Sequence, residues 1–331
     1  MGLLQKAVET YEAHKELAGV YIEGKIPLAP VSHNTTKAQI EITIDRDGNF
    51  IKAESIDKNS PPIIIPVTEE SANRVGSKPH PLCDQLKYFL PENESIYNEY
   101  LSNLRSWLEY DDNPLVRAVF NYISRGTIIK DLTKSNIVKI KENGTLDYKE
   151  KDMIIFSVVG TGSDDGRVWR SKSLMNSFEE YSDKVNSSID KVGCYISGEC
   201  TTPSFRCLKG VVPLYGNAKI ISSNDSVNFT YRGRFTEPEQ AVTIGYNAAQ
   251  MSHNALKWLS ANQGVIIGGR TFLCWNPKGF KLPDVFDPMA DKEEEKTADP
   301  TQYGEQISRI LLGFKANIPE DQGAVIASFD A

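Results

Sequence analysis

Apolar residues recur at helical spacing in several parts of the chain, and this pattern predicts helices. Helices are expected for Leu3 to Leu17, Pro81 to Leu90, Glu94 to Glu109, Pro114 to Ile123, Ser173 to Ser188, Glu237 to Ser260 and the segment ISRILLGFKA. In Glu237 to Ser260, the longest of these segments, Ala248, Met251, Ala255 and Trp258 share one face of the expected helix.

Other segments show strand patterns. Ile40, Ile42 and Ile44 alternate with polar residues in AQIEITIDRDGNFIKAESI, where Asp47-Gly48 predicts a hairpin turn between two strands. Further strands are expected for Ile63 to Val67, Asp152 to Val159, Gly193 to Ser197, Val227 to Phe229, Val265 to Trp275 (a strand pair or one bent strand) and AVIASF. The polar, glycine-containing segment Thr68 to Pro81 is expected to be a loop.

Together these elements predict an α+β fold with small, mixed antiparallel sheets, packed helices and two subdomains. We expect an N-terminal α+β subdomain (1–150), a basic α+β subdomain (151–283), an acidic linker (284–300), and a helix plus strand (301–331). The linker is expected because Pro283 to Pro300 contains the charged run DKEEEKTAD. The strand that closes the chain ends abruptly, which suggests a truncated form.

Charge is unevenly distributed along the 331 residues, whose net charge is -7. Lys and Arg number 19 against 23 Asp and Glu in residues 1–160, 14 against 10 in 161–283, and 4 against 11 in 284–331. A local positive face is therefore compatible with an acidic protein, although such a bias is also typical of an ordinary solvated surface.

Membrane insertion and secretion are not indicated. No window is long and apolar enough for a membrane span, and the first residues carry acids and lack an apolar signal core. The five cysteines form an odd, irregularly spaced set, which is typical of reduced thiols. We therefore expect a cytoplasmic protein without disulfides.

Catalytic motifs are sparse. The four histidines are scattered over different elements, and Cys194, Cys200 and Cys207 lack a C-x-x-C pair. Asp164 and Asp165 lie in a Gly-Ser-Asp-Asp-Gly stretch typical of a turn, and Gly160-Thr161-Gly162 lacks the Lys-Ser/Thr ending of a phosphate loop. We expect no catalytic residue, no metal and no cofactor.

Two stretches carry a specific resemblance. The first is IIIPVTEESANRVGSKPHPLCDQLKYFL, and the second runs from Cys194 to Trp275 through CYISGE, LKGV, SVNF, YNAAQMSHNALKWL and GRTFLCW. In this order and spacing they resemble the Csd family, the large subunit of the type I-C CRISPR surveillance complex (Cascade). The resemblance covers nearly the whole chain, and family members continue into a helical C-terminal region that is absent from this sequence.

The resemblance implies a non-catalytic part in RNA-guided antiviral defence. Such large subunits bind target DNA, recognise the protospacer-adjacent motif in the duplex, help to open it and support recruitment of a helicase-nuclease. The partners implied are guide RNA, target DNA, the backbone, guide 5′-end and small subunits of Cascade, and the helicase-nuclease, with no membrane. The guide reads most of the sequence by base pairing, so the protein need read only a short motif.

Candidate binding residues follow from side-chain chemistry. For the motif we propose Asn73, Arg74, Gly76, Ser77 and Lys78, which combine polar donors, cations and a glycine that permits close backbone approach. For the DNA backbone the candidates are Arg167, Arg170, Lys172, Lys209, Lys219, Arg232 and Arg234. A solvated loop remains the alternative for Thr68 to Pro81, because Glu69 and Glu70 repel phosphate. A metal-dependent nuclease and a purely structural scaffold remain the alternative functions.

Overall fold

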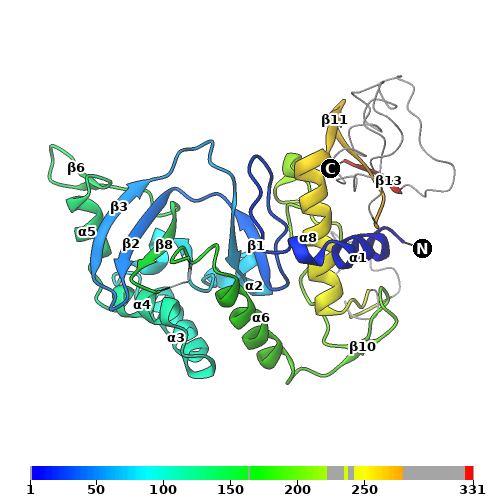
Figure 1. Cartoon of the computed structure of the whole chain (residues 1–331), viewed down its shortest axis with the longest axis horizontal. Coiled ribbons are helices and arrows are strands. Elements are labelled where there is room, and N and C mark those ends of the chain that lie inside the picture. Colours follow the sequence, from blue (N-terminus) through cyan, green and yellow to red (C-terminus); the bar gives the residue numbers. More distant parts are fainter. Residues whose placement is uncertain (1, 163–164, 222–234, 238–241, 279–324, 331) are drawn as a thin grey trace. The chain divides into compact units, whose positions relative to one another are not determined.

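The computed structural model describes residues 2–162, 165–221, 235–237, 242–278 and 325–330 (Figure 1). The chain divides into two compact units. The middle unit is Gly19–Ile189, and the terminal unit combines Met1–Ala18 with Asp190–Ala331. The first helix therefore belongs to the same unit as the C-terminal part of the chain.

The middle unit contains the larger sheet. Its strands are β1 (His33–Thr36), β2 (Ile40–Asp45), β3 (Phe50–Ser55), β4 (Ile63–Pro66), β5 (Asp84–Gln85), β6 (Lys139–Ile140), β7 (Leu146–Asp147) and β8 (Met153–Val159). Its helices are α2 (Glu69–Asn73), α3 (Glu94–Tyr110), α4 (Pro114–Ile123), α5 (Ile128–Lys134) and α6 (Lys172–Asn186), with the 3₁₀ turns η2 (Val75–Ser77) and η3 (Leu86–Phe89). The main sheet has the order β3-β2-β8-β5, with β2 and β8 parallel and the other pairs antiparallel.

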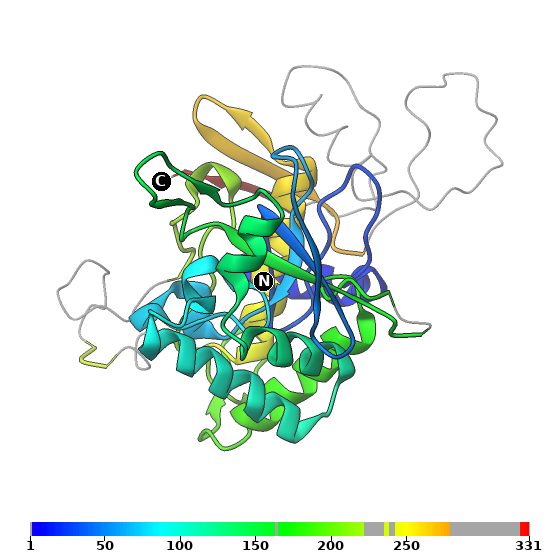
Figure 2. The same ribbon diagram turned by 90° about the vertical axis from the view of Figure 1, so that its left-hand side faces the viewer.

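The alternating isoleucines of β2 form part of the hydrophobic core of this unit. Ile40, Ile42 and Ile44 are buried, and the neighbouring strand β8 is buried over most of its length. Figures 1 and 2 show α3 and α4 side by side against one face of the main sheet, where α4 contacts both β2 and β8. Phe89 packs edge-on against Tyr100 and Phe156, which joins η3, α3 and β8.

The terminal unit is built around two contacting helices, α1 (Leu3–Ala13) and α8 (Tyr246–Gln263). Its strands are β9 (Val192–Gly193), β10 (Cys200–Thr201), β11 (Val265–Ile267), β12 (Arg270–Trp275) and β13 (Val325–Phe329), and its 3₁₀ turns are η1 (Lys15–Leu17) and η4 (Pro213–Tyr215). The strands β11, β12 and β13 form an antiparallel sheet in that order.

The predicted α+β fold is confirmed, with helices and several small sheets of antiparallel and mixed type. The helices expected at the positions of α1, α3, α4 and α6, and the strands expected at β2, β3, β4, β8 and β13, are all present. Val265 to Trp275 forms a strand pair, because Gly268 and Gly269 both adopt positive φ (56° and 80°) and turn the chain between β11 and β12.

Three expectations for individual elements were wrong. Pro81 to Leu90 is not an α-helix, because Leu82 has a φ of 70° and the next residues form β5 and η3. In the helix expected from Glu237, residues 242–245 are not helical, and α8 begins at Tyr246, whose N–H donates to the carbonyl of Thr202; residues 238–241 lie outside the described residues. Gly193 to Ser197 does not form a strand throughout, because β9 ends at Gly193 and a turn follows.

Other predicted elements were incomplete or lie outside the described residues. The segment Thr68 to Pro81 contains the short helix α2, and α5 has no counterpart among the predicted elements. The expected strand Val227 to Phe229, the segment ISRILLGFKA and the linker Pro283 to Pro300 lie outside the described residues. The domain boundaries expected from composition stay a prediction.

Candidate nucleic-acid interface

The segment Thr68 to Pro81 is shaped by a capped short helix. Thr68 and Ser71 exchange backbone-to-side-chain hydrogen bonds, with 3.1 Å from Ser71 N to Thr68 Oγ1 and 2.9 Å from Thr68 N to Ser71 Oγ. These bonds satisfy N–H groups that a helix start leaves without intrahelical acceptors. The helix α2 ends at Asn73, and its C-cap residue Arg74 adopts the left-handed conformation (φ 55°, ψ 38°). The chain therefore turns sharply before the glycine-containing tip.

Arg74 and Asp84 form a bidentate ion pair. Nη2 of Arg74 lies 2.7 Å from Oδ1 of Asp84, and Nη1 lies 3.0 Å from Oδ2. The Asp84 side chain has no exposed surface, whereas the Arg74 side chain keeps 26% of its surface exposed. The guanidinium also lies over the ring of Tyr88, 5.3 Å from its centroid. Two planar groups therefore hold Arg74 in a fixed orientation.

The carboxylate of Asp84 accepts two further bonds. The backbone N–H of His80 donates to Oδ2 at 2.5 Å and that of Gln85 donates to Oδ1 at 2.6 Å. Burial raises the pKa of Asp84, while the Arg74 guanidinium and these N–H donors oppose the rise. The same carboxylate thus connects the end of α2 with the strand β5.

Three further contacts hold the segment. His80 Nδ1 lies 2.9 Å from Ser71 Oγ, and both residues are buried. Asn73 Nδ2 donates to the carbonyl of Glu69 at 2.9 Å, so that this predicted motif residue packs back on its own helix. Lys78 forms an ion pair with Glu99 of α3. The exposed residues of the segment's tip are Gly76, Ser77 and Lys78.

The cations near the start of α6 form a second group. Arg167 pairs with Asp165, with 2.7 Å from Nε to Oδ1, and the guanidinium holds the pKa of that carboxyl below its usual value. Arg170 lies over the ring of Tyr21, 4.8 Å from the centroid, and both Arg170 and Lys172 are exposed. The sequence predicted the cations but gave no sign of the aromatic ring beneath one of them.

Tyr21 connects this group to the strand before the loop. Its hydroxyl donates to the carbonyl of Trp169 at 2.8 Å and accepts from the N–H of Ile64 at 2.7 Å. Burial raises the pKa of Tyr21, which keeps the hydroxyl protonated for donation. The turn that carries Arg170 and the strand β4, which leads into Thr68 to Pro81, are therefore bound to one side chain.

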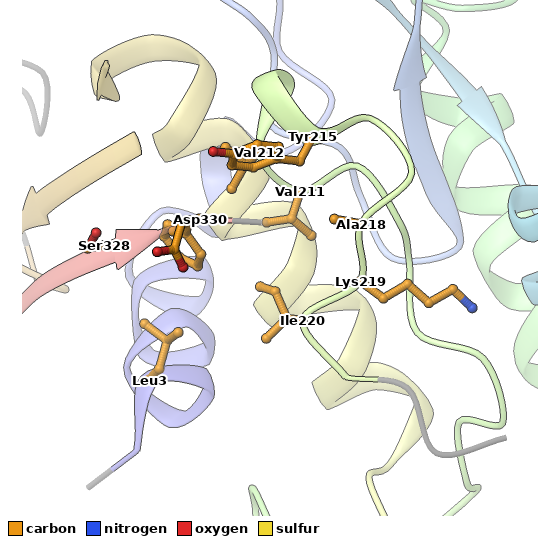
Figure 3. A pocket seen from close by; sticks show the side chains of 10 residues that line it. Leu3, Val211, Val212, Tyr215, Ala218, Lys219, Ile220, Ser328 and Asp330 are labelled. Atoms are coloured by element: carbon orange, nitrogen blue, oxygen red, sulfur yellow. The ribbon is translucent and has the colours of Figure 1, made fainter. Parts of the chain in front are cut away.

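The remaining predicted cations belong to the terminal unit. The backbones of Lys209 and Lys219 are paired in an isolated antiparallel bridge. Lys219 also borders a cavity of about 330 Å³ with apolar walls from Leu3, Val211, Val212, Ile220 and Phe329. Figure 3 shows its ammonium group directed away from that cavity. Arg232 and Arg234 lie outside the described residues.

The residues that the structure describes contain neither a candidate metal site nor a candidate membrane span. Their His, Cys, Asp and Glu side chains form no group of three that could hold a metal ion. Their helices include none that is both long and apolar enough to cross a bilayer.

Comparison with known proteins gives the family. The family model described as CRISPR-associated protein (Cas_Csd1) matches residues 8–325, and the chain therefore belongs to this CRISPR-associated family. A search of curated proteins finds no match. The family that the two quoted stretches resemble is thus confirmed as Csd, whereas the subtype and the role within a complex belong to the proposal below.

Proposed function

We propose that the chain is the non-catalytic large subunit of a type I-C Cascade complex and recognises the protospacer-adjacent motif in duplex DNA. Support for a place in such a complex comes from the family match over residues 8–325. Its partners would be guide RNA, target DNA, the other Cascade subunits and the helicase-nuclease. We assign it no catalytic residue, and antiviral defence follows from the family.

Motif recognition is supported by a loop whose two ends are both bonded to Asp84 and whose tip is exposed. Gly76, Ser77 and Lys78 are exposed, and a Cβ added at Gly76 would meet no atom within 4 Å. A small tip of this kind fits into a groove, where a hydroxyl and an ammonium donate to base edges or phosphates. Because the flanking residues are already held, little conformational entropy is lost on binding.

The test compares the assembled complex on targets with a correct and a scrambled motif, at fixed guide complementarity. Asn73, Ser77 and Lys78 are each replaced by alanine. Loss of a base contact should cost roughly 1 to 3 kcal/mol on the correct motif and much less on the scrambled one. Equal losses on both targets would reduce the tip to a phosphate anchor, and no loss would leave it as a solvated loop.

Lys141→Ala is the matched control for Lys78→Ala. Lys141 is also an exposed lysine in an ion pair, with Asp147, and its side chain is 53% exposed against 48% for Lys78. The control removes a charge and a surface ion pair without touching the loop. An equal effect of the two substitutions would show that only net charge matters.

DNA-backbone contacts should make binding salt-dependent, since each neutralised phosphate releases counterions. Charge reversal at Arg170 together with Lys172 should lower the slope of log affinity against log salt by roughly 2. Reversal at Arg232 with Arg234 tests the predicted pair outside the described residues. An unchanged slope would remove the mutated pair from the contacts.

A metal-dependent nuclease is the second function class. DNA cleavage by the purified chain with Mg²⁺ or Mn²⁺ that is abolished by an acidic-residue substitution would establish it and overturn the non-catalytic assignment.

A further inference from the structure

A buried carboxylate outside the predicted binding residues connects both ends of the loop. Asp84 binds Arg74, at the end of α2, and also the N–H of His80, on the far side of the tip. Asp84 itself is anchored, because it lies in β5 and is paired with Ile154 of the buried strand β8. The side chain of Asp84 therefore joins the two ends of the segment from 74 to 84 and fixes them to the main sheet.

We infer that Asp84 is a positioning residue for motif recognition, acting through Arg74 to hold the tip Gly76, Ser77 and Lys78 in its binding shape. This inference rests on the proposed function of the same loop. It gives Arg74 a different part from the groove contact expected from the sequence, since its guanidinium serves the loop itself.

The contacts that the Arg74 guanidinium already makes within the protein support this assignment. Both terminal nitrogens of Arg74 donate to Asp84, and one face of the group lies over Tyr88. To reach DNA, Arg74 would have to leave a carboxylate whose surface is fully buried. Such a carboxylate left without its cation is strongly unfavourable, so the pair is expected to stay intact when DNA binds.

The backbone conformation of the tip shows why the ion pair between Arg74 and Asp84 is needed. Arg74 and Ser77 have φ values of 55° and 57°, and neither is a glycine. Non-glycine residues adopt the left-handed region at a cost and persist there only where the surroundings hold them. Release of Arg74 removes one of these restraints, and the tip would then populate other shapes.

The two possible roles of Arg74 give opposite results for Asp84→Asn. If Arg74 is a positioning residue, the substitution lowers the preference of the assembled complex for the correct over the scrambled motif at least tenfold. The salt slope then changes no more than Lys78→Ala changes it, because Arg74 itself makes no phosphate contact. If Arg74 instead contacts DNA, Asp84→Asn releases it, and binding is equal or tighter.

Arg74→Gln and the double variant complete the cycle. We expect each single substitution and the double variant to lower the motif preference by a similar factor, because the two residues act as one unit. Arg74→Lys keeps the charge and loses the bidentate geometry, so it serves where Asp84→Asn does not fold. It should also lose the preference, and full retention by Arg74→Lys would overturn the inference.

The result for the wild-type complex separates the two proposals. If it binds both motifs equally, the proposed function of the loop fails. If it prefers the correct motif and Asp84→Asn keeps that preference or binds more tightly, only the positioning role fails. A salt slope that Arg74→Gln lowers more than Asp84→Asn does would likewise show that Arg74 contacts DNA.

Discussion

The indole Nε1–H of Trp275 donates a hydrogen bond to the hydroxyl of Thr10, with 2.8 Å between nitrogen and oxygen. The two residues are 265 positions apart, and both are buried. Thr10 lies on α1 and Trp275 ends β12, so this bond closes the terminal unit between its first helix and its sheet. The same hydroxyl donates to the carbonyl of Lys6 at 2.8 Å, which fixes its direction.

Thr10→Val should destabilise the terminal unit. The substitution keeps the shape of the side chain but leaves the buried indole N–H without its acceptor, at a cost of about 1 to 3 kcal/mol. Urea unfolding followed by tryptophan fluorescence measures the change. Thr10→Ser is the control, since it keeps the hydroxyl and should cost less. Equal losses for the two variants would show that the hydroxyl contributes nothing.

Gly48→Ala should destabilise the middle unit more than Gly144→Ala does. Both glycines lie in hairpin turns with similar positive φ (78° and 80°), so both substitutions carry the strain of a left-handed residue, about 1 kcal/mol. A Cβ at Gly48 would also come within 2.7 Å of Ala118 O and Tyr122 N, whereas one at Gly144 would meet nothing within 4 Å. The difference in unfolding free energy between the variants measures this steric term, and equal values would contradict it.

The sequence predicted elements well where one face of the element is buried. The alternation of Ile40, Ile42 and Ile44 and the apolar run of β8 correspond to buried strands because burial selects side chains with the period of the element. The helix α8 was predicted too long at its start, since a hydrogen bond from Tyr246 to Thr202 begins it later than periodicity alone suggests. Such tertiary contacts leave no periodic signal.

The candidate site shows the same limit. Sequence reasoning identified Asn73, Arg74 and Lys78 as polar donors but missed Asp84 and Glu99, the partners of the two cations. One signal was present for Asp84, because a lone acid within the apolar stretch PLCDQL is expected to need a buried partner. Which cation it pairs with depends on the turn at Arg74, and no pattern in the sequence specifies that turn.

Stability should fall as pH decreases through the range from about 6.5 to 4, in part because of His33. Burial lowers the pKa of His33 to about 4, so the unfolded chain binds a proton in this range that the folded chain does not. The contribution is constant above pH 6.5, falls by about 1.4 kcal/mol per pH unit below it and levels off near pH 4. His33→Asn should remove this part of the slope of unfolding free energy against pH. Parallel curves for the wild type and the variant would contradict the assignment.

The reaction rates of the cysteine thiols should show whether solvent exposure or thiol pKa governs their reactivity. Cys200 is exposed, whereas Cys83, Cys194, Cys207 and Cys274 are buried. Burial raises the pKa of Cys194, but hydrogen bonds from Ser197, Gly245 and Ile196 lower it by more, so that its pKa lies below the ordinary value. If acidity governed the reaction, Cys194 would react early.

We expect solvent exposure to govern the thiol reaction, because Cys194 has only 2% of its surface exposed. The native chain should react with a disulfide reagent such as Ellman's reagent at one fast thiol, and Cys200→Ser should abolish that phase. In urea all five thiols should react. A fast phase that survives Cys200→Ser and disappears with Cys194→Ser would show instead that the turn after β9 opens readily and that the Cys194 thiolate reacts from the open state.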